Sequence, residues 1–238
     1  PDYADAHYGL SKVLYKIGNK DSALESLKKA NAIDPKSKDI QLLLSVLKAK
    51  KVHGNIEGRV KNIFPSRVLE LNMSVEQELI TYLYSKELLD LDKRIDPSFG
   101  DTKGSKYDLF EDSHPTIQRL ETELNSILTE AFNSNIFMAD SFFSIFGAGG
   151  GTGRHNHVNK NDRDSTFSLA KQKYALVYYL SVGDQGGTEP GFLKFYEPNE
   201  EILPRKGLIT IFPADRYHSS LYDGNKDRVI VGVNFYTL

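Results

Sequence analysis

The sequence predicts an α+β chain, in which a short all-helical segment precedes a larger domain built mainly of antiparallel strands in a barrel or jelly roll. Three observations lead to this class. Apolar residues recur at helical spacing over the first fifty or so residues, and two further helical stretches follow. From Ile136 onward the apolar period drops to two, and Gly, Asp, Asn and Pro clusters separate short runs. No helix-length segment separates the later strands, which excludes a parallel sheet with crossover helices.

Bulk composition narrows the function classes. The 238 residues are enough for one large domain, or for a medium domain with a small appendage. A net charge of -2 is too close to neutral for a nucleic-acid-binding surface. The chain has no cysteine, which excludes disulfides, a thiol nucleophile and a cysteine zinc site, and favours a reducing compartment; we expect the cytoplasm. No apolar run approaches the roughly 18 residues of a membrane span, so we expect no membrane association.

The N-terminal segment, residues 1–53, is predicted to be helical. Two apolar stripes with three- and four-residue spacing flank Gly18-Asn19: Leu10, Leu14 and Ile17, then Ala23, Leu27 and Ala30. Asp21-Ser22 is placed to cap the second helix, which stops at Asp34-Pro35.

The order of these residues resembles a tetratricopeptide repeat. Pro1 and Pro35 are one repeat length, about 34 residues, apart, and residues 38–51 would supply the first helix of the next repeat. Such arrays need about three repeats, so the resemblance implies that residues 1–53 belong to a longer array whose concave surface recruits a protein or peptide partner. An ordinary helical hairpin is the alternative.

Residues 58–238 are expected to form the second domain. Residues 60–71, around Phe64-Pro65, suggest an edge strand or an extended entry segment. Residues 74–88 read as a helix, residues 96–107 as an exposed loop, and a second helix begins at Ser113-His114-Pro115 and ends near Phe132.

The strands of this domain are predicted from alternation. They are expected at Ile136–Phe146, Tyr174–Val182, Phe192–Tyr196, Leu208–Phe212 and Val229–Tyr236. The glycine-rich run 147–153 lacks the lysine and the strand-to-helix context of a phosphate loop. We interpret it as a flexible lead-in to the following residues.

Three histidines form the candidate metal site. In a strand, His155 and His157 project to the same face about 7 Å apart, close enough to share one ion. His218 follows an apolar strand and a turn, and it supplies a third ligand. Neutral imidazole suits iron, copper, nickel and zinc alike. His-x-His alone is a weak signal, so the prediction rests on the whole set.

The set resembles the Fe(II)/2-oxoglutarate oxygenases of the prolyl-hydroxylase type. Their pattern is His-x-Asp, a Tyr-Leu strand, a Gly-Gly-x-Leu-x-Phe-like strand, a distal His, and an Arg or Lys about ten residues later. This chain shows the same order: His155-Asn156-His157, Tyr178-Tyr179-Leu180, Gly186-Gly187 with Leu193-Lys194-Phe195, His218, and Arg228. It also resembles an oxygenase subfamily whose motif runs His-x-His. Over residues 58–238 the resemblance implies a double-stranded β-helix (a jelly roll), an Fe(II) cofactor, 2-oxoglutarate and O2 as co-substrates, and hydroxylation of an unidentified substrate. A peptide substrate is suggested by analogy with prolyl hydroxylases and by the helical segment.

Arg228 is the candidate group for binding the co-substrate. With Ile230, Gly232 and Asn234 it shares one face of the last strand, and an arginine facing a barrel interior needs an anionic partner. The resemblance implies the distal carboxylate of 2-oxoglutarate, with Tyr179 as a second donor and Gly232 leaving the room. The alternative is an ion pair between Arg228 and Asp223 or Asp227 in a solvated turn.

His157 occupies the position at which these oxygenases carry a carboxylate. Three interpretations remain open: all three histidines bind the metal, Asn159 takes the place of the acid beside His157 and His218, or an acid from residues 162–164 completes the site. The first leaves the spacing to His218 undisturbed. Replacing a carboxylate by imidazole makes the site more positive and alters its chemistry. Besides the oxygenase, the sequence is therefore compatible with a degenerate barrel that senses a metal or ligand, and with a cupin-type metalloenzyme that does not use 2-oxoglutarate.

Overall fold

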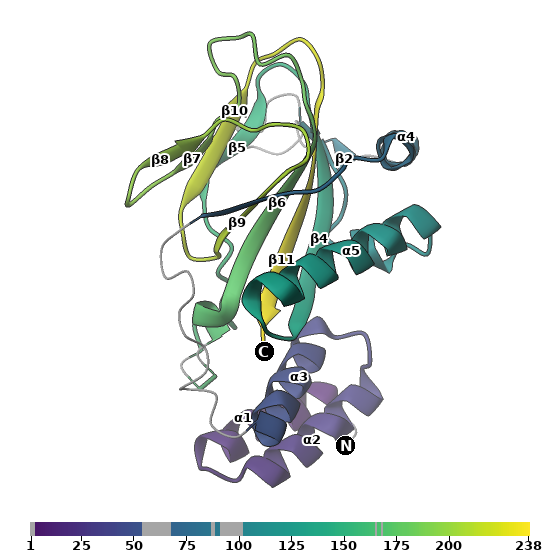
Figure 1. The fold of residues 1–238 in the computed structure, drawn as a ribbon. Coiled ribbons are helices and arrows are strands. Elements are labelled where there is room, and N and C mark those ends of the chain that lie inside the picture. The colour runs from purple at the N-terminus through teal and green to yellow at the C-terminus, as the bar shows by residue number, and fades with distance from the viewer. Residues whose placement is uncertain (1–2, 54–67, 87–88, 91–101, 165, 168) are drawn as a thin grey trace.

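The computed structural model describes residues 3–53, 68–86, 89–90, 102–164, 166–167 and 169–238 (Figure 1). Three helices come first: α1 (Ala4–Lys16), α2 (Lys20–Ile33) and α3 (Lys38–His53). Two more, α4 (Gln77–Ser85) and α5 (Pro115–Phe132), precede most of the strands, as the sequence predicts. No helix in these described ranges combines the length and the apolar composition needed to cross a membrane.

The strands form two antiparallel sheets that face each other. The large sheet has the order β1-β9-β6-β11-β4-β3-β2, and the small sheet has the order β5-β10-β7-β8. The large-sheet strands are β1 (Leu69–Asn72), β2 (Leu89–Asp90), β3 (Thr102–Gly104), β4 (Ile136–Phe146), β6 (Lys173–Val182), β9 (Leu208–Pro213) and β11 (Arg228–Thr237). The small-sheet strands are β5 (Gly150–His155), β7 (Leu193–Phe195), β8 (Glu200–Ile202) and β10 (His218–Tyr222). This two-sheet arrangement confirms the predicted jelly-roll class.

Local residue chemistry sets the ends of the helices. Asn19, rather than the predicted Asp21-Ser22 pair, caps α2, because its side chain accepts a hydrogen bond from the Ser22 backbone N–H. At α5, Pro115 occupies the first turn, where its missing N–H costs nothing. Asn133 ends that helix with a φ of 46° in the left-handed region.

The large sheet has a different apolar cluster on each face. Its outer face packs against α4 and α5, where Leu83, Leu120 and Leu124 are buried with Val231 and Phe235. Its inner face meets the small sheet across a second cluster, which includes Phe146, Tyr179, Phe195, Phe212 and Ile230. Alternating residues of β11 therefore contribute to both layers, as the period of two predicts. The candidate site lies on the inner face.

The three N-terminal helices pack against one end of the barrel (Figure 1). Leu27, Leu43 and Leu47 belong to the same buried cluster as Phe167 and Tyr236 of the barrel domain. The Tyr15 and Phe167 rings lie 4.7 Å apart between centroids. The helical character of residues 1–53 is confirmed, whereas their assignment to a tetratricopeptide array stays a prediction.

Two of the predicted elements need correction, and a third is confirmed over the residues that the structure describes. The glycine-rich run is not a flexible lead-in, because β5 begins at Gly150 and pairs with β10, a strand that alternation did not predict. A Cβ on Gly151 would lie 2.3 Å from the Ser220 carbonyl oxygen, so this close pairing requires glycine. The predicted loop at 96–107 contains β3, which pairs with β4. Of residues 60–71, the described end forms the edge strand β1, and Phe64-Pro65 lies outside the described residues.

Candidate metal centre

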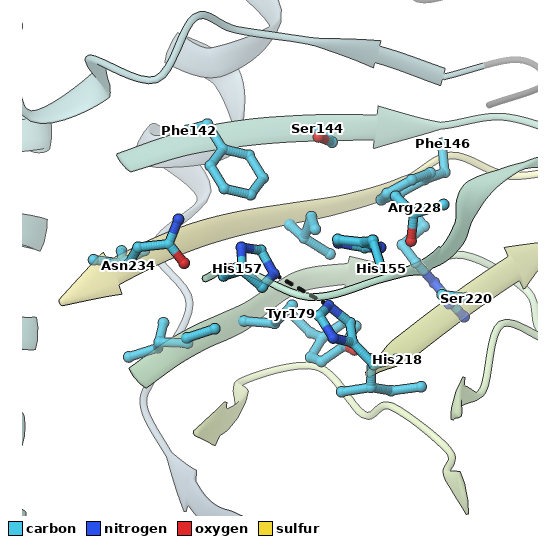
Figure 2. A pocket seen from close by; sticks show the side chains of 17 residues that line it. Phe142, Ser144, Phe146, His155, His157, Tyr179, His218, Ser220, Arg228 and Asn234 are labelled. Atoms are coloured by element: carbon cyan, nitrogen blue, oxygen red, sulfur yellow. Dashed lines mark hydrogen bonds between the residues drawn. The ribbon is translucent and has the colours of Figure 1, made fainter. Parts of the chain in front are cut away.

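The two sheet-borne histidines are placed by strand pairing. His155 is the last residue of β5, His218 is the first residue of β10, and the two are partners in the antiparallel register. His157 is not in the same strand as His155, contrary to expectation, because β5 has already ended. The His157 backbone N–H instead donates to the Ala214 carbonyl at 2.8 Å, which turns the chain back over the site. All three imidazoles converge even so (Figure 2).

The donor atoms of the histidines fit one metal ion. One ring nitrogen from each lies within 4.8 Å of the other two, and the Nε2 atoms of His157 and His218 are 3.2 Å apart. Two nitrogens that are each about 2.1 Å from one ion at right angles lie about 3 Å apart. The observed separation therefore suits adjacent positions on a single ion.

Backbone carbonyls orient two of the rings. Nδ1 of His155 is 2.7 Å from the Gly153 oxygen, and Nδ1 of His218 is 3.1 Å from the Arg216 oxygen. A carbonyl only accepts, so both Nδ1 atoms carry the proton and both Nε2 lone pairs face the cluster. These contacts hold the tautomer that binds metal.

Burial keeps the rings of His157 and His218 neutral. Removal from solvent, together with the neighbouring imidazoles, lowers the pKa of His157 to about 2 and that of His218 to about 3. At neutral pH neither ring is protonated twice, so the close approach of the two Nε2 atoms is not explained by a proton shared between charged and neutral imidazole. A metal cation fits this donor set, because neutral imidazole is the form that binds it.

The alternative third ligands are engaged elsewhere. The Asn159 side-chain oxygen accepts from the backbone N–H groups of Asn161 and Asp162, at 2.8 and 3.0 Å. Asp162 is 1% exposed and lies 2.8 Å from the Lys173 ammonium group, and its second oxygen accepts from Tyr236. Asp164 pairs with Lys12 of α1. Among the described residues, the three-histidine set is the one that converges.

Arg228 and Tyr179 line the same cavity as the histidines (Figure 2). Arg228 opens β11 and is 1% exposed, and Tyr179 is 3% exposed on the adjacent strand β6. Burial raises the pKa of the Tyr179 phenol, so it remains a hydrogen-bond donor throughout the physiological range. The cavity is thus lined by imidazole nitrogens, which can bind a metal, and by two hydrogen-bond donors, the Arg228 guanidinium and the Tyr179 hydroxyl.

The Arg228 guanidinium has no acidic partner among the described residues. It donates to the carbonyls of Pro190 and Gly191, both at 2.6 Å, and its Nε is buried without a partner. The alternative pairing is absent: Asp223 accepts from Thr188, and Asp227 accepts from Tyr84. Burial lowers the pKa of Arg228, because desolvation disfavours the charged form of the guanidinium. A carboxylate ligand fits this position.

Glycines shape the walls around Arg228 differently from the prediction. Gly191 has a φ of +83°, and a Cβ there would lie 1.7 Å from an Arg228 nitrogen. Gly232 does not leave room for a ligand, because the Phe142 ring covers it, with a ring carbon 2.3 Å from the place of a Cβ. Sequence reasoning assigned no role to Phe142 or Asn234, which both line the cavity. The signal available for Asn234 was its place on the Arg228 face of β11.

A scan against protein-family models and a search of curated proteins each found no match. Solved structures do match. A viral collagen prolyl hydroxylase from Paramecium Bursaria Chlorella virus-1, in complex with 2-oxoglutarate, is 13% identical, with a TM-score of 0.52 over 78% of this chain and 100% of the other. The chain shares its fold.

Two further solved structures extend the comparison. HygX from Streptomyces hygroscopicus, with nickel, 2-oxoglutarate and hygromycin B bound, is 12% identical, with a TM-score of 0.55 over 76% of this chain and 87% of the other. A Trichoplax adhaerens prolyl hydroxylase, in complex with a hypoxia inducible factor peptide fragment, is 15% identical, with a TM-score of 0.51 over 86% and 96%. At these identities the likeness establishes the jelly-roll fold.

Proposed function

We propose that this chain is an Fe(II)- and 2-oxoglutarate-dependent dioxygenase. The observation that carries the proposal is one cavity lined by three converging imidazoles and by a buried guanidinium without an acidic partner among the described residues. A 2-oxo acid with a distal carboxylate has the two functional groups that these features bind. The fold shared with oxygenases that bind 2-oxoglutarate supports the assignment.

The residues of the chain divide the work of binding. His155, His157 and His218 hold the ion and leave its remaining positions open. Arg228 pairs with the distal carboxylate, and the Tyr179 hydroxyl donates to the same group. A bound Fe(II) supplies the redox chemistry through which O2 reacts. In the overall reaction one oxygen atom of O2 enters a substrate C–H bond as a hydroxyl, and the other converts 2-oxoglutarate into succinate and CO2.

The substrate that we propose is a peptide side chain. Support comes from the Trichoplax prolyl hydroxylase of the same fold, whose structure contains a peptide. The N-terminal helices lie at one end of the barrel and offer an additional surface for a polypeptide partner.

The proposal can be tested with iron and 2-oxoglutarate alone, so the test does not require an identified substrate. Under anaerobic conditions, adding Fe(II) and 2-oxoglutarate should produce a visible metal-to-ligand charge-transfer band, and admitting air should then produce succinate. His218→Ala should abolish the band, whereas Ser85→Ala on α4, far from the cavity lining, should leave it unchanged. Absence of both band and succinate in the parent protein contradicts the proposal.

A second function is favoured by one specific observation. The metal-binding set contains no carboxylate among the described residues, in contrast to the two-histidine, one-carboxylate site of this enzyme class. The second function is therefore that of a sensor: the barrel binds a metal and 2-oxoglutarate but does not catalyse a reaction. His157→Asp distinguishes the two functions through succinate formation. If the parent protein is an oxygenase, it already forms succinate, and the variant forms the same amount or less. If the parent protein is a sensor without turnover, only the variant forms succinate.

A further inference from the structure

A polar side chain lines the cavity on the other side of the histidines from Arg228. Asn234 lies on β11, six residues after Arg228, and is 5% exposed. Figure 2 shows its carboxamide beside the His157 ring, with Arg228 beyond the histidine cluster. The proposed function gives this amide no task, since Arg228 and the histidines account for both ends of 2-oxoglutarate.

Asp140 determines how the Asn234 amide points. The Asn234 Nδ2 donates to Asp140 Oδ2 at 3.3 Å, across the pairing of β11 with β4. A carboxylate only accepts, so the nitrogen faces Asp140 and Oδ1 faces away from it. The Oδ1 atom is buried and accepts no hydrogen bond from any described residue. An acceptor in this state is costly to bury unless a donor reaches it.

The missing donor cannot come from the co-substrate. 2-Oxoglutarate carries only acceptor oxygens at neutral pH, and these would repel Oδ1. Apolar residues such as Phe142 and Ala175 also line this cavity. The donor is therefore expected from an N–H or O–H group of the substrate.

We propose that Asn234 determines substrate specificity by accepting, at Oδ1, a hydrogen bond from an N–H or O–H group beside the carbon that reacts. The inference rests on the proposed function and adds the chemical class of the substrate. That class is a molecule with an N–H or a hydroxyl donor, such as an amide or an alcohol, near its reactive carbon, rather than a plain hydrocarbon chain. Asp140 is the positioning residue, because it holds the amide in the orientation that presents oxygen.

The experiment uses two pairs of small probes that differ in the donor. N-methylacetamide is compared with N,N-dimethylacetamide, and 2-propanol with acetone, on the protein loaded with Mn²⁺ and 2-oxoglutarate. The faster relaxation of the probe methyl protons next to the paramagnetic ion reports binding in the cavity. The donor-bearing member of at least one pair should bind roughly fivefold to tenfold more tightly, as expected for one hydrogen bond to an otherwise unpaired group. The pair that shows the larger preference identifies amide or hydroxyl.

Variants test whether the preference comes from the amide. Asn234→Leu keeps the branched shape of the side chain and should remove the preference, and Asp140→Asn should weaken it, because the paired amide can then rotate. Ser144→Ala, on another cavity-lining residue, should leave it intact. No donor preference in the parent protein, or a preference that survives Asn234→Leu, overturns the inference.

Failure of the proposed function gives a different result. If neither Mn²⁺ nor 2-oxoglutarate binds, the dioxygenase assignment fails. The probe pairs are then compared on the metal-free protein by saturation-transfer NMR, and the same two criteria decide the role of Asn234.

Discussion

Arg228→Met should remove the preference of this protein for a 2-oxo acid with a distal carboxylate. Methionine keeps an unbranched apolar stem, which can still lie over the Tyr222 ring, where the guanidinium carbon is 4.5 Å from the centroid. The charge and its donors are lost. Because Pro190 and Gly191 lose a donor to their carbonyls, the variant should also be less stable without ligand.

The size of the effect follows from the burial of Arg228. The guanidinium is 1% exposed, so a carboxylate that pairs with it is also removed from water. Removing one member of such a desolvated charge pair costs about 2–5 kcal/mol of binding free energy. This corresponds to a dissociation constant for 2-oxoglutarate that rises by about 30-fold to a few thousand-fold.

The assay compares the binding of two ligands, 2-oxoglutarate and 2-oxopentanoate, to the parent protein and to Arg228→Met. 2-Oxopentanoate has the five-carbon chain and the 2-oxo acid group of 2-oxoglutarate but no distal carboxylate. Calorimetric titration of the Zn²⁺-loaded protein should show a strong preference for 2-oxoglutarate, and in Arg228→Met that preference should fall to within about threefold, because the interaction energy of the pair is gone. Arg228→Lys should show an intermediate preference, since it keeps the charge without the planar fork. An undiminished preference in Arg228→Met would refute the assignment of Arg228 to the distal carboxylate.

Two further substitutions test the surroundings of the site. Gly151→Ala should weaken Zn²⁺ binding and lower the melting temperature, because its Cβ meets the Ser220 backbone; the matched Gly9→Ala in α1, where a Cβ meets nothing within 4 Å, should stabilise the helix by up to ~1 kcal/mol. A Gly151→Ala protein with unchanged Zn²⁺ affinity would show that β5 tolerates a wider separation from β10. Lys12→Met should lower the free energy of unfolding by at most ~1 kcal/mol at pH 6, because its ion pair with Asp164 is partly exposed. Hydrogen bonds from Lys12 and Thr166, together with the Lys12 charge, lower the pKa of Asp164 from 3.8 to about 2, so the Lys12 contribution is complete above pH 4 and disappears as pH falls towards 2. Denaturant titrations of the parent protein and Lys12→Met between pH 4 and pH 2 measure the difference in their free energies of unfolding. A difference that grows on acidification contradicts the prediction.

The elements predicted well from the sequence are those specified by their own side chains. β4 has the predicted bounds, Ile136–Phe146, because a run rich in apolar and aromatic residues favours a strand, and the glycine-rich run follows it. The second helix of the barrel domain begins at the predicted proline for the same kind of local reason. The metal-site prediction depended on residue types at set spacing, and the structure brings those histidines together.

The elements that were missed depend on partners distant in sequence. Half of the residues of β5 are glycine, so its extended form comes from pairing with β10 rather than from side-chain preference. The departure of His157 from that strand depends on a contact with Ala214, which no local pattern reveals. Phe142 covers Gly232 because β4 and β11 are paired in one particular register. The orientation of Asn234 likewise depends on Asp140, almost a hundred positions away in the chain.

The segment that follows His157 is attached to the helices as well as to the barrel. Asn161 donates to Asp39 of α3 at 2.6 Å, Asp164 pairs with Lys12 of α1, and Phe167 packs on Tyr15. Removing residues 1–53 would expose that aromatic surface and take away these contacts with the segment after His157. We therefore expect the helices and the barrel to stabilise each other around the candidate metal centre, and thermodynamic linkage makes the effect reciprocal. A ligand that stabilises the contacts between the helices and this segment should raise the affinity of the site for metal. The metal should then raise the affinity for that ligand by the same factor.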